Sequence, residues 1–142
     1  MQPIVTFAIP CYNVEHCVEH CITSIMHPDI LDKVEILCIN DGSTDNTSTL
    51  LHKYEDQHPD VIRVIDKENG GWGTAINLAM REAKGMYFKE IDADDWVETT
   101  NLPVYIKLLE ETECDYVATD YAEYWQNEHV LHPHTYQTQI YN

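Results

Sequence analysis

Positive charge is scarce in this chain of 142 residues, which has 8 Lys and Arg against 25 Asp and Glu and a formal net charge of −17 with His neutral. Nucleic acids and anionic lipids bind to basic patches, so both are disfavoured as partners. Long apolar runs are lacking too, and no membrane-spanning segment is predicted. The first ten residues lack the basic segment of a signal peptide and are predicted to form a strand. Peripheral association with a membrane stays open.

Glycine and proline are also few, with 5 and 6 residues, which excludes a low-complexity or collagen-like chain. Cysteine occurs 5 times, an odd number without regular spacing. This pattern indicates free thiols in a reducing compartment, and we expect a cytoplasmic protein. The length fits a single domain with a substantial hydrophobic core.

Short β-rich runs alternate with helical patterns along the chain. Strands are predicted at residues 4–9, 34–39, 61–65, 86–91 and 115–119. Helices are predicted at 14–26, after Asp45, between Thr74 as N-cap and Gly85 as C-terminal stop, and at 102–111. Such alternation is typical of an α/β fold with a mostly parallel sheet and helices on both faces.

Ligands of parallel α/β sheets bind at the carboxyl ends of the strands. The unusual polar residues of this chain concentrate there, in segments 10–13, 40–43, 66–73 and 92–95. After Tyr121 the sequence has no clear period. We therefore expect 1–142 to form one domain that is truncated.

The most acidic of these segments is Asp92-Ala93-Asp94-Asp95. Three carboxylates this close repel one another and need a cation or solvent. At a strand end they would form a hard-oxygen site for Mg²⁺ or Mn²⁺. The alternative is a solvated acidic turn that caps the next helix.

The other segments each allow two interpretations. Asp41 could accept a hydrogen bond from a base or a sugar hydroxyl, or could belong to an Asx turn. The loop 69–73 matches neither the dinucleotide fingerprint nor a P-loop. It could present a helix N-terminus to anionic oxygens, or serve as a tight turn that needs positive φ. Tyr12 could stack on a nucleobase or pack on its own loop.

Histidine and cysteine form one further candidate site. His16 with His20, and Cys17 with Cys21, are i, i+4 pairs that could offer zinc ligands. Cys21 belongs to the apolar face of the predicted helix, where a free cysteine behaves as a small hydrophobe, and we favour that interpretation. Three more histidines, which we expect at the surface, are His129, His132 and His134.

Taken together, the four strand-end motifs resemble family-two glycosyltransferases, which are inverting enzymes that use nucleotide-diphosphate sugars. The resemblance spans about residues 3–125 and is greatest to bacterial enzymes that build surface polysaccharides. The motifs occur in the order Pro10-Cys-Tyr12-Asn13, Asn40-Asp41-Gly42-Ser43, Asn69-Gly-Gly-x-Gly-x-Ala-x-Asn77 and Asp92-Ala-Asp94-Asp95.

The resemblance implies a Rossmann-like, type-A glycosyltransferase fold and a role for each motif. Pro10 and Tyr12 would line the base pocket, and Asp41 would bind the base, usually uracil. Asp92 would approach the ribose, and Asp94 would hold Mn²⁺ or Mg²⁺ on the diphosphate, with Asp95 beside it. The loop through Asn69 and Gly73 would shape the donor site, and Lys67 would contact a phosphate or the edge of the base.

One part of the family pattern is not found. Inverting transfer needs a base for the acceptor hydroxyl, a carboxylate downstream of the Asp-x-Asp motif. Asp120, Glu123 and Glu128 follow the motif, but none matches a pattern, and no catalytic base is assigned. We interpret 1–100 as the donor half and 101–142 as the start of an incomplete acceptor half.

The predicted function is transfer of a sugar from a nucleotide-diphosphate donor, with UDP as the favoured nucleotide, to a saccharide or lipid-linked acceptor. The setting would be cell-surface polysaccharide synthesis. Two alternatives are a nucleotide-sugar-binding module without turnover and a nucleotidyltransferase. The second lacks its basic glycine-rich signature near the N-terminus. The oligomeric state is left open by the sequence.

Overall fold

A computed structural model describes residues 2–125 and 128–132 of the chain. It contains two compact units, one that ends at Thr112 and one that begins at Glu113. The prediction of a single domain over 1–142, with a donor half 1–100, therefore stays a prediction.

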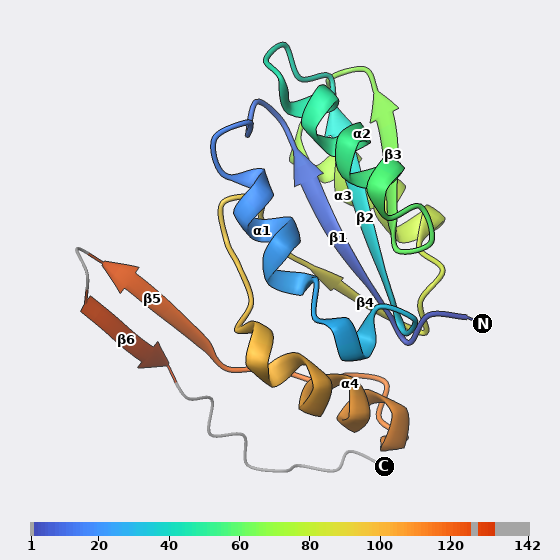
Figure 1. The fold of residues 1–142 in the computed structure, drawn as a ribbon, viewed down its shortest axis with the longest axis vertical. Coiled ribbons are helices and arrows are strands. Elements are labelled where there is room, and N and C mark those ends of the chain that lie inside the picture. Colours follow the sequence, from blue (N-terminus) through green and yellow to red (C-terminus); the bar gives the residue numbers. More distant parts are fainter. Residues whose placement is uncertain (1, 126–127, 133–142) are drawn as a thin grey trace. The chain divides into compact units, whose positions relative to one another are not determined.

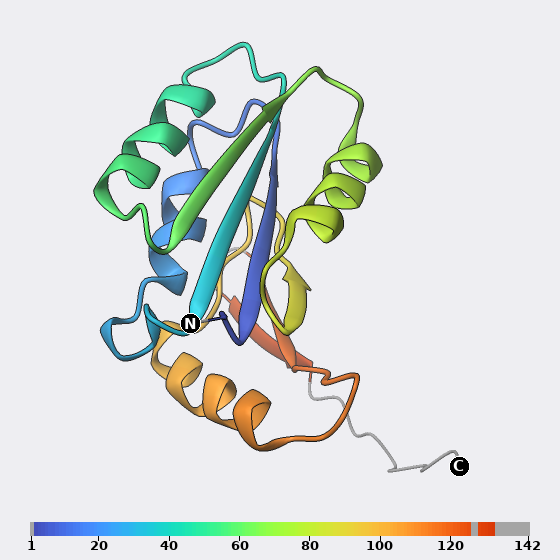
Figure 2. The ribbon, with the colours of Figure 1, turned by 90° about the vertical axis from the view of Figure 1, so that its right-hand side faces the viewer.

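The first unit is built on a four-stranded parallel sheet with the order β3-β2-β1-β4. Helices α1 and α2 lie on one face and α3 on the other (Figures 1 and 2). This confirms the predicted α/β fold with helices on both faces. The strands are β1 (Val5–Cys11), β2 (Val34–Asp41), β3 (Ile62–Lys67) and β4 (Tyr87–Glu90). The helices are α1 (Val18–Ile25), α2 (Thr47–Gln57), α3 (Trp72–Glu82) and α4 (Leu102–Glu111).

The central strands are buried on both faces, which accounts for their continuous runs of apolar residues. Every residue of β2 is buried. Pro10 in β1 is compatible with the sheet because β4 pairs with β1 only as far as Ala8, so nothing in the sheet flanks Pro10 on that side. The core beneath α3 consists of Ala8, Leu37, Ile39, Ala75 and Ala79.

Two helix boundaries differ from the prediction at their N-termini. The first helix begins at Val18 instead of residue 14, because the side chains of Ser43, Asp45 and Thr47 bind the backbone at 13–15 and hold it in a turn. The third begins at Trp72, with Gly71 as N-cap at φ 85°, so Thr74 is not the cap. The Thr74 hydroxyl instead donates to the Gly71 carbonyl oxygen.

Gly85 is not a helix stop either. The third helix ends at Glu82, and Ala83 continues in an extended conformation. Gly85 lies against β1: a Cβ at this position would be 2.4 Å from the Thr6 nitrogen. The glycine is therefore required by a close approach between two segments far apart in sequence, which local patterns do not reveal.

The second unit contains a hairpin of β5 (Tyr121–Trp125) and β6 (Glu128–His132), paired antiparallel. The predicted strand at 115–119 was wrong, and the structure shows no strand there. Its β-branched and aromatic residues favour a strand, but such preferences act through cross-strand partners and do not form a strand alone. The predicted surface position of His134 lies outside the described residues. Among the described residues, no helix has both the length and the apolar character needed to cross a membrane.

Candidate functional site: a cavity at the carboxyl ends of the strands

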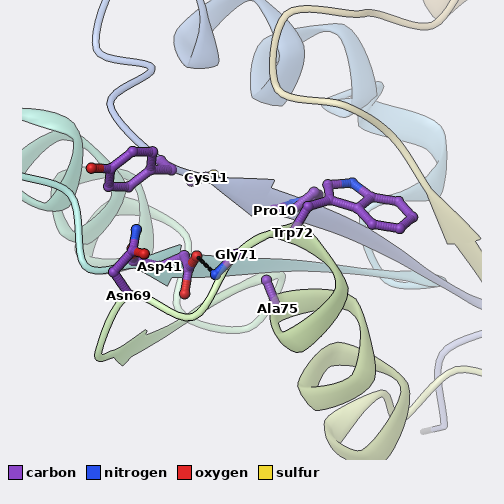
Figure 3. Close-up of a pocket in the computed structure, with 8 residues that line it drawn as sticks. Pro10, Cys11, Asp41, Asn69, Gly71, Trp72 and Ala75 are labelled. Atoms are coloured by element: carbon purple, nitrogen blue, oxygen red, sulfur yellow. Dashed lines mark hydrogen bonds between the residues drawn. The ribbon is translucent and has the colours of Figure 1, made fainter.

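A cavity of about 290 Å³ opens where β1, β2 and the loop after β3 end and α3 begins (Figure 3). Parallel strands bring their carboxyl ends to one edge, so segments 60 residues apart in sequence meet here. The lining residues are Pro10, Cys11, Tyr12, Asp41, Asn69, Gly71, Trp72 and Ala75.

Asp41, the last residue of β2, holds the glycine-rich loop in place. Its side chain is 4% exposed and accepts hydrogen bonds from the backbone N–H groups of Gly70 (2.9 Å) and Gly71 (2.7 Å). Lys67, directly opposite Asp41 in the β2–β3 register, donates to the same carboxylate. Asn69 closes the arrangement by donating from Nδ2 to the Asp41 carbonyl oxygen at 3.0 Å.

This set of donors keeps Asp41 ionised. Burial on its own raises the pKa of a carboxyl group, but here the bonds from Lys67, Gly70 and Gly71 outweigh it, and the pKa of Asp41 lies below its ordinary value. The neighbouring Gly42 has φ 70°, and a Cβ there would be 2.7 Å from the Asn69 nitrogen. The strand end and the glycine-rich loop thus touch backbone to backbone.

Tyr12 stands at the mouth of the cavity on a loop that is fixed by its neighbour. Asn13 has a left-handed φ of 53°, and its side-chain oxygen accepts from the Thr44 N–H at 2.8 Å. The Ser43 hydroxyl in turn accepts from the Asn13 N–H at 3.0 Å. A side chain of each loop thus accepts a hydrogen bond from a backbone N–H of the other loop. These bonds hold Tyr12 at the surface, with half of its area exposed.

A polar network that the sequence analysis did not anticipate lies on the opposite face of the same strand ends. Asn40 donates from Nδ2 to Asp66 Oδ1 at 2.6 Å and accepts from the Ser43 N–H at 3.2 Å. His52 on α2 bridges Asp66 (2.7 Å) and Glu55 (2.8 Å) through its two ring nitrogens. The bonds to Asp66 and Glu55 raise the pKa of His52, and the bond from Asn40 contributes most to lowering the pKa of Asp66.

The acidic segment follows β4, and Asp92, Asp94 and Asp95 are exposed on it. Burial, followed by the charges of Asp94 and Asp92, raises the pKa of Asp95. Burial also raises the pKa of Glu90, assisted by a hydrogen bond with Asp92. Negative charge therefore accumulates at the end of β4, where Lys89 is a neighbouring cation that interacts with Glu90.

The carboxylate oxygens of this segment are the ligand type that Mn²⁺ and Mg²⁺ prefer. Within 2–125 and 128–132, no group of three His, Cys, Asp or Glu side chains is arranged to hold a metal ion by itself. Ions of this kind are commonly bound through one or two carboxylates together with substrate phosphates. The donor set fits that arrangement.

The structure brings most of the predicted site residues to one edge of the sheet. Pro10, Tyr12, Asp41 and Asn69 line the cavity, and Lys67 contacts it through Asp41. Gly73 lies in the first turn of α3 and is not among the lining residues.

Trp72 is a lining residue that the sequence analysis missed. It is 58% exposed and makes a side-chain hydrogen bond with Glu90, so it connects the start of α3 to the end of β4. The pattern Gly-Gly-Trp-Gly gave no sign that the aromatic residue would begin the helix. Cys21, by contrast, is fully buried, which confirms its predicted place in the core.

The sequence matches the family described as Glycosyl transferase family 2 over residues 6–141. The chain belongs to glycosyltransferase family 2. A chondroitin synthase from Pasteurella multocida (strain Pm70) is 36% identical over 105 residues, which cover 74% of this chain and 11% of the synthase. The chain thus spans about a tenth of the length of that relative.

Solved structures of glycosyltransferases share the fold. Crystalline S. aureus TarS in complex with UDP-GlcNAc is 25% identical, with a TM-score of 0.64 over 75% of this chain and 31% of that chain. The mannosyltransferase PcManGT from Pyrobaculum calidifontis, in complex with GDP-Man and Mn²⁺, is 28% identical, with a TM-score of 0.59 over 76% and 33%. These likenesses confirm the predicted type-A glycosyltransferase fold.

Proposed function

We propose that this chain is the donor-binding part of an inverting, metal-assisted glycosyltransferase that uses a UDP-sugar. The observation that carries the proposal is a single sheet edge with two features. One is a cavity lined by the ionised Asp41, and the other is the acidic segment after β4, in which three carboxylates lie within four residues. A nucleotide diphosphate offers a planar base and an anionic diphosphate, which match the two features in turn.

The cavity is the proposed base pocket. Its volume of about 290 Å³ is at the lower end of the range for ligand pockets, which is suited to a single base rather than to a whole nucleotide sugar. Tyr12 has an exposed ring for stacking, and Pro10 adds an apolar wall. Oδ2 of Asp41 accepts one bond, from Gly71, so a lone pair is left for an N–H of uracil. The UDP-GlcNAc complex of TarS supports the choice of UDP.

Lys67 contributes through Asp41 in this proposal. Its Nζ is bound by the Asp41 carboxylate and by the Glu68 carbonyl oxygen, so contact with a phosphate would break that ion pair. Asn69 and Gly73 belong to the loop and the helix start that follow it. Their proposed role is to shape the donor side of the site.

Asp94 is the proposed metal ligand and Asp92 the proposed ribose contact. The chain carries a net charge of −17, and the acidic segment would repel a diphosphate. A bound Mn²⁺ or Mg²⁺ would reverse that sign and neutralise charge on the departing diphosphate. The Mn²⁺ complex of PcManGT supports this assignment.

The acceptor and the base that activates it are not assigned to residues of this chain. Asp120 and Glu123 follow the acidic segment in the sequence and belong to the second unit. A saccharide or lipid-linked acceptor and a role in surface polysaccharide synthesis are part of the proposal, as is a cytoplasmic location. Three of the cysteines, Cys11, Cys21 and Cys38, are buried thiols, which suits a reducing compartment.

Calorimetric titration of UDP with Mn²⁺, repeated after EDTA, tests the proposal. We expect saturable binding with Mn²⁺ that weakens at least tenfold in EDTA, and weaker binding of GDP. Loss of metal dependence would refute the metal role, and equal binding of UDP and GDP would refute the role of Asp41. Sugar transfer by a longer protein that contains this chain would separate the enzyme from the alternative of a binding module without turnover.

A further inference from the structure

The acidic segment and the residues that follow it lie along one side of α1. The Cys21 thiol donates to the Asp92 carbonyl oxygen at 3.6 Å, and the His20 and Trp96 rings lie 5.0 Å apart at an angle of 56°. Ser24 is the next residue on this side. Figure 1 shows the chain after β4 running beside α1. The backbone of the loop is thus held against a helix, while its aspartates stay exposed.

Ser24 makes the best-defined contact of this group. It is 7% exposed, and its hydroxyl donates to the Cys21 carbonyl oxygen at 2.7 Å while accepting from the Val97 N–H at 3.1 Å. The Ser24 carbonyl oxygen accepts from the Thr99 hydroxyl at 2.7 Å. Because the hydroxyl proton is used within the helix, its lone pair is directed to the loop. Removing it would leave the Val97 N–H without its partner.

These contacts bracket Asp94. Cys21 binds the backbone two residues before it, and Ser24 binds the backbone three residues after it. The charge of Asp94 also reaches α1: after burial, it is the second cause that raises the pKa of Cys17. The position of the Asp94 carboxylate is therefore set by a short loop with an anchor on each side.

We propose that Ser24 is a positioning residue that fixes the acidic segment on α1 and thereby sets the affinity of Asp94 for the divalent cation. This inference rests on the proposed function of the segment as a metal site. Groups that orient a metal ligand without touching the metal typically change metal affinity by 10–100-fold when they are removed. The Ser24 side chain makes one hydrogen bond to the loop, so the expected change in metal affinity is near tenfold, the lower limit of this range.

The test compares Ser24→Ala with Thr23→Ala. Thr23 is the adjacent residue of α1; it is exposed, and its hydroxyl bonds only to carbonyl oxygens of its own helix. At a fixed UDP concentration, the Mn²⁺ concentration for half-maximal UDP binding should rise about tenfold in Ser24→Ala and stay within twofold in Thr23→Ala. At saturating Mn²⁺ the UDP affinity of all variants should agree within twofold. Ser24→Thr, which keeps the hydroxyl, should restore the wild-type value.

Amide hydrogen exchange in EDTA gives a readout that needs neither metal nor UDP. The Val97 amide should exchange faster in Ser24→Ala than in Thr23→Ala. An unchanged Mn²⁺ requirement in Ser24→Ala, with metal-dependent UDP binding in the wild type, would overturn the inference whether or not exchange changes. Absence of metal-dependent binding in the wild type would refute the proposed function itself, and the inference with it.

Discussion

Replacement of Asp41 by Asn is the sharpest test of how the site is built. The carboxylate accepts from Gly70, Gly71 and Lys67, and both of its oxygens are used. Asparagine has the same shape but only one acceptor oxygen. Its NH₂ group, which can only donate, must therefore face an N–H donor, and that donor loses its hydrogen bond. Lys67 also loses its ionised partner.

The expected cost is about 3 kcal/mol of folding free energy. A bond from a backbone donor to a charged group is typically worth about 1.5–3 kcal/mol, and breaking a buried ion pair costs about 3–5 kcal/mol. The lower part of that range applies, because the Lys67 side chain is 20% exposed and keeps its bond to the Glu68 carbonyl oxygen.

Urea denaturation at pH 7 measures this cost. The control is Asp56→Asn on the exposed side of α2, where we expect a change within about 0.5 kcal/mol. A double-mutant cycle with Lys67→Met separates the ion pair from the two backbone bonds, and a coupling of about 1 kcal/mol or more is expected for groups in contact. A cost below about 1 kcal/mol for Asp41→Asn would refute the claim that this carboxylate holds the loop.

The pH dependence of the same variant gives an independent check. The folded pKa of Asp41 is lowered, so its stabilisation is complete above the unfolded pKa of about 3.9 and is lost as pH falls through the folded value. The difference between wild type and Asp41→Asn should therefore be constant above about pH 5 and narrow toward pH 3. A difference that does not change with pH would contradict an ionised Asp41.

Two further predictions concern the glycines and the histidine network. Gly85→Ala places a Cβ 2.4 Å from the Thr6 nitrogen and should lower the free energy of unfolding, measured in urea, by about 3 kcal/mol. A Cβ added at Gly73 would have no atom within 4 Å, so Gly73→Ala should raise the free energy of unfolding by about 0.5–1 kcal/mol. Equal effects of the two substitutions would refute the close approach at Gly85. Because Asp66 and Glu55 raise the folded pKa of His52, its stabilisation is complete below about pH 6.5 and is lost as pH rises through the folded value. The excess stability of wild type over His52→Gln should shrink between pH 6 and pH 9, and a constant difference would count against the network.

The sequence predicted the strands of the sheet well, because burial on both faces leaves runs such as 34–39 with hardly a polar residue. It also predicted that the polar motifs after the strands would come together, since the carboxyl ends of parallel strands share one edge. Helix boundaries were less predictable. Side-chain capping rules favour Thr74, but the chain reverses at Gly71, which needs no side chain to begin a helix.

Contacts between distant segments could not be predicted at all. The role of Gly85 depends on the backbone of β1, and the hydrogen bond that the Val97 N–H donates to the Ser24 hydroxyl joins a loop to a helix 73 residues away. Neither residue has a distinctive local pattern. Trp72 was missed for the same reason, since its partner Glu90 lies on another element.

The two residues that end β2 explain why the motif must lie at this point of the strand. Side chains alternate along a strand, so Asn40 and Asp41 point to opposite faces of the sheet. In the β2–β3 register they lie opposite Asp66 and Lys67. One pair joins α2 through His52, and the other holds the glycine-rich loop before α3. If β2 slipped by one residue along β3, Asn40 and Asp41 would exchange faces of the sheet, and Asp41 would lie opposite Asp66 instead of Lys67. The register that forms the cavity therefore also pairs the charges at its wall.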